Sequence, residues 1–294
     1  MNQSDVPLRL RLAARGLDGV TLLVLPSIAL LFALFVYPFS YGLWLSFNPK
    51  TGSWLGNYAT FFSDPFLYDT VITTLRLALP VTVLNVLVAL PVAFRVRLMP
   101  RQRVLTTILV LPVTLGTVLI AEGLLNYLGP QGWLSRSLML LGLVQTPVKL
   151  LHNYWGVFIS LVLTGFPFTF LLILSYVTGI DPALERAAAT LGARAASRFW
   201  NITLPLLAPG LAITFCLSFV QAFSVFPSAV LLGAPAGPTR VISIAAYQAA
   251  FEQYDYSMAS AIAMIMGAVQ LVVVTIFLGA RGLFYRGPAG GGKG

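Results

Sequence analysis

Side chains that could perform catalysis or bind a metal are scarce in this chain of 294 residues. There is one histidine, His152, one cysteine, Cys216, and nine acidic residues. The motifs H-E-x-x-H and G-x-S-x-G, which give hydrolases their zinc ligands or nucleophile, are absent from the sequence. A lone cysteine forms no internal disulfide, and no neighbours of His152 would complete a metal site. We therefore expect neither a catalytic centre nor a bound metal in this chain.

Two charged side chains lie inside long apolar stretches, where an ionisable group needs a partner or a function. Arg76 and Glu122 are about five and six residues from the outer ends of their stretches, or roughly 8 to 9 Å deep if the stretches are helical. We predict that they form an ion pair across adjacent antiparallel helices. Alternatively, Glu122 attracts a cationic solute or reaches up to interfacial water.

Uncharged polar side chains follow a helical spacing in another apolar stretch, residues 204–233. Ser218, Gln221 and Ser224 are three residues apart, which places them on one helix face. This face is a candidate solute pathway, although hydrogen bonding between packed helices explains it equally well. Asn85 and Asn126, in two other stretches, are weaker candidates of the same kind.

The same stretch of 30 residues is longer than one membrane crossing. It contains Pro209-Gly210 and Pro227, so we predict that the helix is interrupted there. Broken helices are tolerated in membranes where they line a cavity, and they often mark a transport site.

The composition indicates that the helices carrying these side chains lie in a membrane. Apolar residues make up 58% of the chain and charged residues 9%, whereas soluble domains average roughly 25% charged residues. We therefore expect an all-α integral membrane protein with six transmembrane helices and no sizeable soluble domain. The six apolar stretches are 20–47, 71–94, 104–128, 155–178, 204–233 and 258–284. A shorter apolar segment, 132–144, suits an interfacial position better than a seventh span.

Basic residues divide unevenly when the loops between six spans are alternated. Thirteen of the 18 lie on the side of both termini, four on the other side, and Arg76 within a span. Cytoplasmic loops carry the excess of Lys and Arg, so both termini are predicted to be cytoplasmic. The first group comprises Arg9, Arg11, Arg15, Arg95, Arg97, Arg101, Arg103, Arg186, Arg194, Arg198, Arg281, Arg286 and Lys293, and the second Lys50, Arg136, Lys149 and Arg240. This distribution explains the net charge of +9 without nucleic-acid binding.

The domain organisation that we predict has three parts. Residues 1–19 form a cytoplasmic N-terminal segment, residues 20–284 a six-span transmembrane domain, and residues 285–294 a flexible cytoplasmic tail. Within the transmembrane domain, residues 179–205 form the cytoplasmic loop between the fourth and fifth spans.

This loop carries clear helix signals. Asp181 is a good N-cap, Pro182 suits the first helical position, and Glu185 lies near the positive end of the helix dipole. Gly192 can adopt the positive φ that ends a helix. The apolar residues follow the i, i+3, i+4, i+7 pattern of one helix face; they are Leu184, Ala187, Ala188 and Leu191. A second helical piece, 194–200, precedes Pro205, where the fifth span is predicted to start.

The spacing in the loop resembles the "EAA" loop of permease subunits of bacterial ABC importers, whose pattern is E-A-A, three residues, Gly, nine residues and I-x-L-P. The matching residues are Ala187, Ala188, Gly192, Ile202, Leu204 and Pro205. Arg186 occupies the place of the usual Glu, one residue after Glu185. The chain length and six spans also fit, and the resemblance is closest to permeases of the polyamine, opine and phosphonate type.

The resemblance implies that the loop contains a coupling helix, which seats in a cleft of an ATP-binding subunit. The residues expected to take part are Leu184, Glu185, Arg186, Ala187, Ala188, Leu191, Gly192, Arg194 and Arg198. Either Glu185 replaces the usual acid through a small rotation of the helix, or Arg186 meets a different partner residue. The chain itself would then be non-catalytic and without a cofactor, with ATP and Mg on the partner.

The resemblance also implies the remaining partners. They are two ATP-binding subunits, a second permease that is a different chain, and an external solute-binding protein, assembled in a bacterial inner membrane. Tyr247, Phe251, Tyr254 and Tyr256 in the last external loop are explained by an aromatic belt, and a docking site for the binding protein would have the same composition. The expected solute is small and polar, of polyamine, opine or phosphonate type. The alternative is a secondary active transporter or facilitator that works without an ATPase.

Overall fold

The computed structural model of the chain describes residues 19–50 and 52–284. Within these ranges every regular element is helical and no strand forms. Six helical segments are long and apolar enough to cross a membrane, as the composition predicted. They are Leu23–Ser46, Pro65–Arg97, Gln102–Leu140, Tyr154–Thr178, Ala195–Phe223 and Tyr256–Gly279. The predicted tail 285–294, and the predicted N-terminal segment except its last residue, lie outside the described residues.

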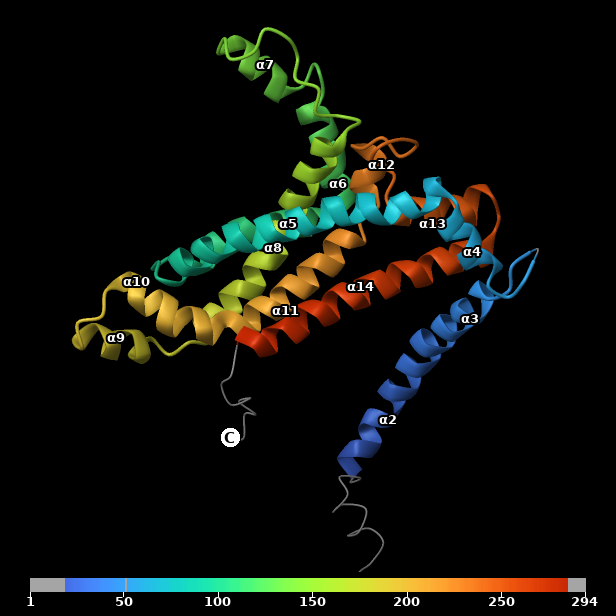
Figure 1. Cartoon of the computed structure of the whole chain (residues 1–294). Helices are drawn as coiled ribbons and strands as arrows, with labels where there is room; N and C mark the ends of the chain where they lie inside the picture. Colours follow the sequence, from blue (N-terminus) through green and yellow to red (C-terminus); the bar gives the residue numbers. More distant parts are fainter. Residues whose placement is uncertain (1–18, 51, 285–294) are drawn as a thin grey trace, which may run out of the picture.

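The first span extends away from the other helices (Figure 1). It consists of α2 (Gly19–Leu31), a π-helical turn η1 (Phe32–Val36) and α3 (Tyr37–Ser46). None of its most apolar 18-residue window is buried. Its contacts are at α3, which packs on α14 (Tyr256–Phe284) and hydrogen bonds through Ser46 to Asn57 and Tyr58 of α4 (Gly56–Ser63). The apolar surface of the first span is therefore left for lipid or another subunit.

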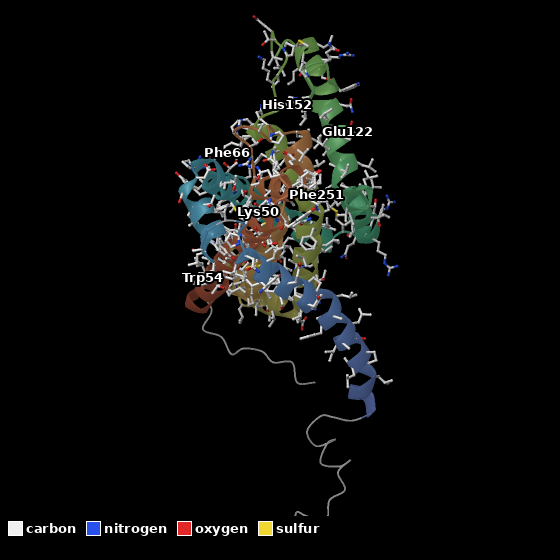
Figure 2. The ribbon with its side chains drawn as sticks, turned by 90° about the vertical axis from the view of Figure 1, so that its right-hand side faces the viewer. Lys50, Trp54, Phe66, Glu122, His152 and Phe251 are labelled. Atoms are coloured by element: carbon white, nitrogen blue, oxygen red, sulfur yellow. The ribbon has the colours of Figure 1, made fainter. Side chains whose placement is uncertain are left out.

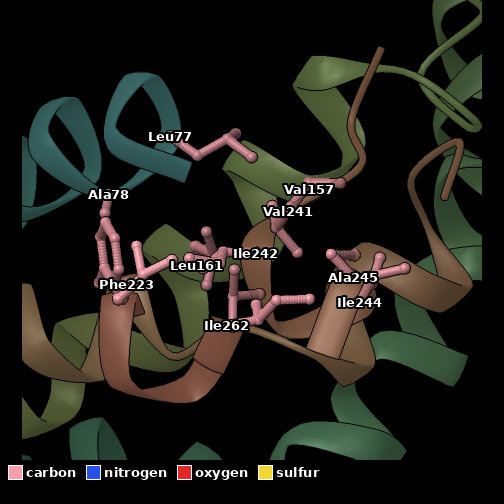
Figure 3. Close-up of a cluster of buried hydrophobic side chains, with 14 of the residues drawn as sticks. Leu77, Ala78, Val157, Leu161, Phe223, Val241, Ile242, Ile244, Ala245 and Ile262 are labelled. Atoms are coloured by element: carbon pink, nitrogen blue, oxygen red, sulfur yellow. The ribbon is translucent and has the colours of Figure 1, made fainter. Parts of the chain in front are cut away.

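The centre of the bundle is formed by α5 (Pro65–Arg97), α8 (Tyr154–Thr178) and α11 (Leu204–Phe223). Figure 3 shows the larger of two buried clusters, where Leu77, Val157, Phe223, Ile242 and Ile262 bring α5, α8, α11, α13 (Ile242–Tyr247) and α14 together. A smaller cluster of α5, α8 and α11 residues lies towards the opposite end of α5. These helices therefore form the packed core that positions the loops at both ends.

Local signals explain the limits of α5. Asp64 caps its start by accepting a hydrogen bond from the Phe66 N–H at 2.9 Å, and Pro65 occupies the first turn. Arg95 and Arg97 lie in its last turn, where a positive charge complements the helix dipole. The helix is 33 residues long, and it therefore extends beyond the predicted stretch 71–94 on both sides.

The third span, α6 (Gln102–Leu128), is kinked at Gly116, whose φ of +72° is non-helical. This conformation is readily available to glycine and strained for residues with a Cβ. The predicted interfacial segment 132–144 forms a short helix, α7 (Trp133–Leu140), and not a seventh span. Figure 1 shows α7 projecting beyond the bundle at the end of α6.

The predicted interruption at Pro209-Gly210 is wrong, because α11 continues through both residues to Phe223. Gly210 lies directly against the ring of Tyr176 on α8, so a Cβ there would collide with the ring. The glycine therefore permits close helix packing. The break falls after Phe223, and Pro227 then begins the short helix α12 (Pro227–Leu231).

The fifth span also begins earlier than predicted. The helical piece α10 (Ala195–Arg198) runs without interruption through the π-helical turn η2 (Phe199–Thr203) into α11. Pro205 therefore lies inside a continuous helix and does not start one. In the π-helical turn the Leu204 N–H bonds to the Phe199 carbonyl, five residues back, and this wider turn leads into the proline.

At the other end of α5 lies a buried arginine that was expected only as an outer-side charge. It lies just before α13 in the chain and contacts η3 (Gln248–Glu252). Arg240 is 6% exposed and donates to the Phe66 carbonyl at 2.8 Å and to Gln248 Oε1 at 2.9 Å. Its guanidinium also lies 3.9 Å from the centre of the Phe66 ring. Burial lowers the pKa of Arg240, while the charges of Asp64 and Glu252 oppose that shift. Arg240 thus joins the start of α5 to α13 and η3.

Candidate functional site

The loop between the fourth and fifth spans contains the predicted helix, α9 (Pro182–Thr190). Asp181 caps it by accepting a hydrogen bond from the Ala183 N–H at 2.8 Å. Leu191 closes it, and Gly192 follows with a φ of +83° in the left-handed region. Asp181 and Gly192 have the local roles that the sequence predicted, whereas Leu191 was expected only as part of the apolar face. In Figure 1, α9 and α10 lie together at one end of the bundle, near the ends of α5 and α8.

The apolar face of α9 is open. No residue of α9 is buried, and Leu184 is 47% exposed. Leu191, directly after the helix, is 88% exposed. Between the two leucines, the small side chains of Ala187 and Ala188 leave room for a partner to approach the helix backbone closely. Nothing in the described part of the chain covers this face, so it is available to a partner.

Glu185 is the residue of α9 that turns towards the bundle. Its carboxylate accepts a hydrogen bond from Arg97 Nη2 at 3.1 Å and from the Thr203 hydroxyl at 3.2 Å. The side chains of Arg97 and Glu185 are 12% and 29% exposed. Arg97 also donates to the Val177 carbonyl at 2.9 Å, and Arg198 donates to the backbone carbonyl of Glu185 at 3.2 Å. The pairing of Arg97 with Glu185 was not predicted.

The other basic residues of the loop differ in their surroundings. Arg186 and Arg194 are exposed, whereas Arg198 is partly buried against α9. Arg186 lines a hollow of about 450 Å³ together with Arg97, Glu185 and Arg198. The surface beside α9 is therefore predominantly basic, because the Glu185 carboxylate is occupied within the chain.

A second candidate region is a cavity of about 290 Å³ between α5, α6, α8, α11 and α12. It brings together four of the predicted pathway residues, which are Asn85, Ser218, Gln221 and Ser224. Its other polar lining residues are Thr117, Thr164 and Ser228, and no lining residue is charged. The spacing of 218, 221 and 224 therefore placed these three side chains correctly on one face.

The lining residues also make contacts between helices. The Ser218 and Thr169 hydroxyls lie 2.8 Å apart, and those of Ser160 and Ser228 also lie 2.8 Å apart. Gln270 of α14, which was not among the predicted residues, donates to the Ser224 hydroxyl at 3.0 Å. Packing and cavity lining are therefore combined in the same side chains.

Asn85 differs from the other lining residues in its burial. It is 2% exposed, and its Oδ1 has no hydrogen-bond partner. A Cβ on Gly165 of α8 would lie 2.6 Å from Asn85 Nδ2, so the glycine makes room for the amide. A buried, partly unsatisfied amide beside a cavity can exchange hydrogen bonds with a solute or water.

Glu122 and Asn126 lie outside this cavity. Both are exposed on α6, and the Asn126 amide donates to the Glu122 carbonyl at 3.0 Å; Figure 2 shows Glu122 on that helix. The predicted ion pair with Arg76 does not form. Among the described residues, the pairs within 4.0 Å are Lys50–Asp255 and Arg97–Glu185. The prediction took α5 and α6 as close neighbours, but α5 packs mainly on α8 and α11.

The aromatic residues of the loop that was predicted to be external line an apolar groove of about 810 Å³ between α3, α13, η3 and α14. Tyr247, Phe251 and Tyr256 contribute to it, and Tyr254 lies beside it with a φ of +52°. His152 is held by a contact of 3.2 Å between its ring and the Gly233 carbonyl. Within residues 19–50 and 52–284, no group of three His, Cys, Asp or Glu side chains could hold a metal ion.

Comparisons with known proteins connect these features. The family model described as "Binding-protein-dependent transport system inner membrane component" matches residues 51–287. A "Probable sulfate transport system permease protein cysT" of Prototheca wickerhamii is 30% identical over 177 residues, which cover 60% of this chain and 67% of the relative. The "Spermidine/putrescine transport system permease protein PotB" of Haemophilus influenzae is 31% identical over 179 residues, covering 60% and 62%. The chain therefore spans about two thirds, or slightly less, of these relatives.

Solved structures support the same fold. A chain of a bacterial alginate ABC transporter, crystallised in complex with an alginate pentasaccharide-bound periplasmic protein, superposes with a TM-score of 0.77. The match covers 92% of this chain and 96% of the other, at 23% sequence identity. At that identity the likeness establishes the helical arrangement.

Proposed function

This chain belongs to the family of binding-protein-dependent transport system inner membrane components, and we propose that it supplies half of the translocation pathway of an ATP-driven importer. The chain is a permease subunit of an ABC importer, and such subunits are non-catalytic. The alternative of a secondary transporter or facilitator finds no support in this family.

The observation that carries the proposal is the open apolar face of α9. A helix with no buried residue, whose Leu184 is 47% exposed and which is followed by Leu191 at 88% exposed, is poorly stabilised alone. Burial of this face against an ATP-binding subunit accounts for its composition. Closure of two such subunits around ATP and Mg would then move α9 and the spans attached to it. In this arrangement α9 and both termini face the cytoplasm.

Arg186 gives this docking surface its charge. Because the Glu185 carboxylate is engaged by Arg97 and Thr203, we do not assign it the role of the usual surface acid. The sequence left two alternatives, that Glu185 replaces the usual acid or that Arg186 meets a different partner residue. The engagement of Glu185 favours the second, with an acidic residue on an adapted ATPase as the partner of Arg186. Arg194 adds a second exposed positive charge at the edge.

The cavity lined by Asn85, Ser218, Gln221 and Ser224 is proposed as this chain's part of the solute pathway. Its lining of hydroxyl and amide groups suits a small polar solute that is recognised by hydrogen bonds. The PotB relatives favour a polyamine, and opine- or phosphonate-type solutes remain in the proposed class. Glu122 and Asn126 on the exposed side of α6 are proposed as a secondary part of the route, where Glu122 would attract a cation.

The remaining partners belong to the same assembly. We propose two ATP-binding subunits, a second permease that is a different chain, and an external binding protein, in a bacterial inner membrane. The exposed first span and α6 offer apolar surface to lipid and to the second permease. The binding protein would dock at the outer end, near the aromatic residues of α13 and η3.

Reconstitution into proteoliposomes tests this proposal. The chain is purified together with its ATPase, second permease and binding protein, and uptake of radiolabelled spermidine, sulfate and a phosphonate is measured with and without enclosed ATP. We expect uptake of one solute that requires both ATP and the binding protein. Uptake by the isolated chain under an ion gradient, without any ATPase, would contradict the proposal.

A further inference from the structure

The helix α9 is joined to the bundle mainly through one polar side chain. Its own residues are not buried, so apolar packing does little to fix its position. Glu185 makes the polar contacts instead: its carboxylate receives hydrogen bonds from Arg97 at 3.1 Å and from Thr203 at 3.2 Å, and its backbone carbonyl accepts one from Arg198 at 3.2 Å. The position of α9 relative to the bundle therefore depends on this contact.

The partners of Glu185 belong to helices that cross the membrane. Arg97 lies in the last turn of α5, and Thr203 is the last residue before α11. The second donor group of Arg97, Nη1, bonds to the Val177 carbonyl in the last turn of α8 at 2.9 Å. Figure 1 shows the ends of these helices beside α9. Four elements thus meet at one hydrogen-bonded point.

The contact between α5 and α9 joins two helices that are not neighbours in the sequence. The segments before and after α9 already join it to α8 and, through α10, to α11. Arg97 and Glu185, however, are 88 positions apart, and α5 is not adjacent to the loop in the chain. Apart from the packing of α5 on α8 and α11, this contact is what joins α5 to α9.

We propose that Glu185, Arg97 and Thr203 form a latch that transmits displacement of α9 to α5 and α11. All three are positioning residues, since they touch neither the solute nor ATP. The latch rests on the proposed function, because it presupposes an ATPase that moves α9. Its consequence is that α5, which carries the cavity residue Asn85, moves together with the coupling helix.

The hydrogen bonds of the latch have alternative partners nearby. The Nε atoms of Arg97 and Arg198 are buried without a hydrogen-bond partner. The Thr203 hydroxyl has two acceptors within reach, Glu185 Oε1 at 3.2 Å and the Arg198 carbonyl at 3.4 Å, but only one hydrogen to donate. A network with such spare donors and acceptors can exchange partners when the helices shift.

The experiment uses the complete complex of both permeases, ATPase and binding protein in proteoliposomes. Two quantities are measured: the affinity of the ATPase for the permeases, and the stimulation of phosphate release by the binding protein. The variants are Glu185→Gln, Arg97→Gln and the charge swap Arg97→Glu with Glu185→Arg. Arg95→Gln is the matched control, because Arg95 lies in the same turn of α5 and is exposed.

We expect each single latch variant to bind the ATPase with unchanged affinity but to lose stimulation about five-fold or more, the range of a typical coupling between sites. The charge swap restores the ion pair but not the hydrogen bonds to the Val177 carbonyl and from the Thr203 hydroxyl, so it should recover part of the wild-type stimulation, and Arg95→Gln should retain all of it. The unchanged ATPase affinity of the single variants shows that they are not simply misfolded.

Three results would overturn the latch. They are wild-type stimulation in both single variants, a loss of ATPase affinity that accounts for the lost stimulation, and a charge swap that recovers nothing. If the wild-type chain binds no ATPase at all, the proposed function is wrong and the latch is rejected with it. If the wild-type chain binds the ATPase and one of the three results above is found, only the latch is rejected.

Discussion

Leu191 offers the sharpest test of the docking surface, because its side chain is 88% exposed next to α9. Full burial of a leucine side chain contributes about 1.5–3 kcal/mol, and nearly all of that is available when a partner covers Leu191. The change Leu191→Ser should therefore raise the Kd for the ATPase about 10- to 100-fold, at 1.4 kcal/mol per factor of ten. The permease itself should keep its stability within about 0.5 kcal/mol, since the side chain has little contact within the chain.

A control with the same exposure is present in the chain. Leu140, the last residue of α7, is also 88% exposed but belongs to the projecting segment beyond α6. The Kd is measured by surface plasmon resonance with the detergent-solubilised permease pair immobilised and the purified ATPase in solution. An unchanged Kd for Leu191→Ser, or an equal loss for Leu140→Ser, would refute the assignment of α9 as the docking surface.

Three further predictions concern the cavity, the outer end and the start of α9. Asn85→Leu should lower initial uptake in proteoliposomes at least ten-fold with ATPase affinity unchanged, because it removes the buried amide of the cavity; wild-type uptake would exclude Asn85 from the pathway. Arg240→Met should lower the free energy of unfolding by about 2–3 kcal/mol, since the Phe66 carbonyl loses its donor; an unchanged Tm in detergent would contradict this. Asp181→Ala should destabilise α9 by about 1 kcal/mol and speed amide hydrogen exchange at residues 183–190, and unchanged exchange would show that the cap is not needed.

The elements that could be predicted from the sequence are those determined by local signals or by hydropathy. The six spans follow from long apolar stretches, which have few other solutions in a bilayer. The helix α9 follows from a capping aspartate, a proline in the first turn and a glycine at positive φ, all within 12 residues. None of these signals depends on a distant part of the chain.

The features that were mispredicted or missed depend on which helices are neighbours. Proline followed by glycine usually indicates a break in a helix, so one was predicted at Pro209-Gly210. Gly210 instead makes room for the ring of Tyr176 on α8, and the sequence of α11 does not reveal that neighbour. The Arg76–Glu122 pair assumed that α5 packs on α6. The Arg97–Glu185 contact joins residues 88 positions apart, and no local pattern relates them.

The candidate pathway was predicted partly from local spacing and depends partly on which helices are neighbours. Helical spacing correctly placed Ser218, Gln221 and Ser224 on one face, since that depends only on the period of a helix. Asn85 was named for its polarity alone, and its place in the same cavity came from the packing of α5 on α8. Glu122 was paired with Arg76 from depth alone, whereas it is exposed on α6 and the pair does not form.

The central claim is that α9 is the contact between this permease and its motor, and cross-linking tests it most directly. A cysteine at position 187, on the open face of α9, is treated with a short bifunctional thiol reagent in the assembled complex; Cys216 is buried in α11 and does not compete. We predict a cross-link to the ATP-binding subunit whose yield changes when ATP is added. A cysteine that reacts freely with a water-soluble maleimide in the complex, and forms no cross-link to that subunit, would contradict the claim.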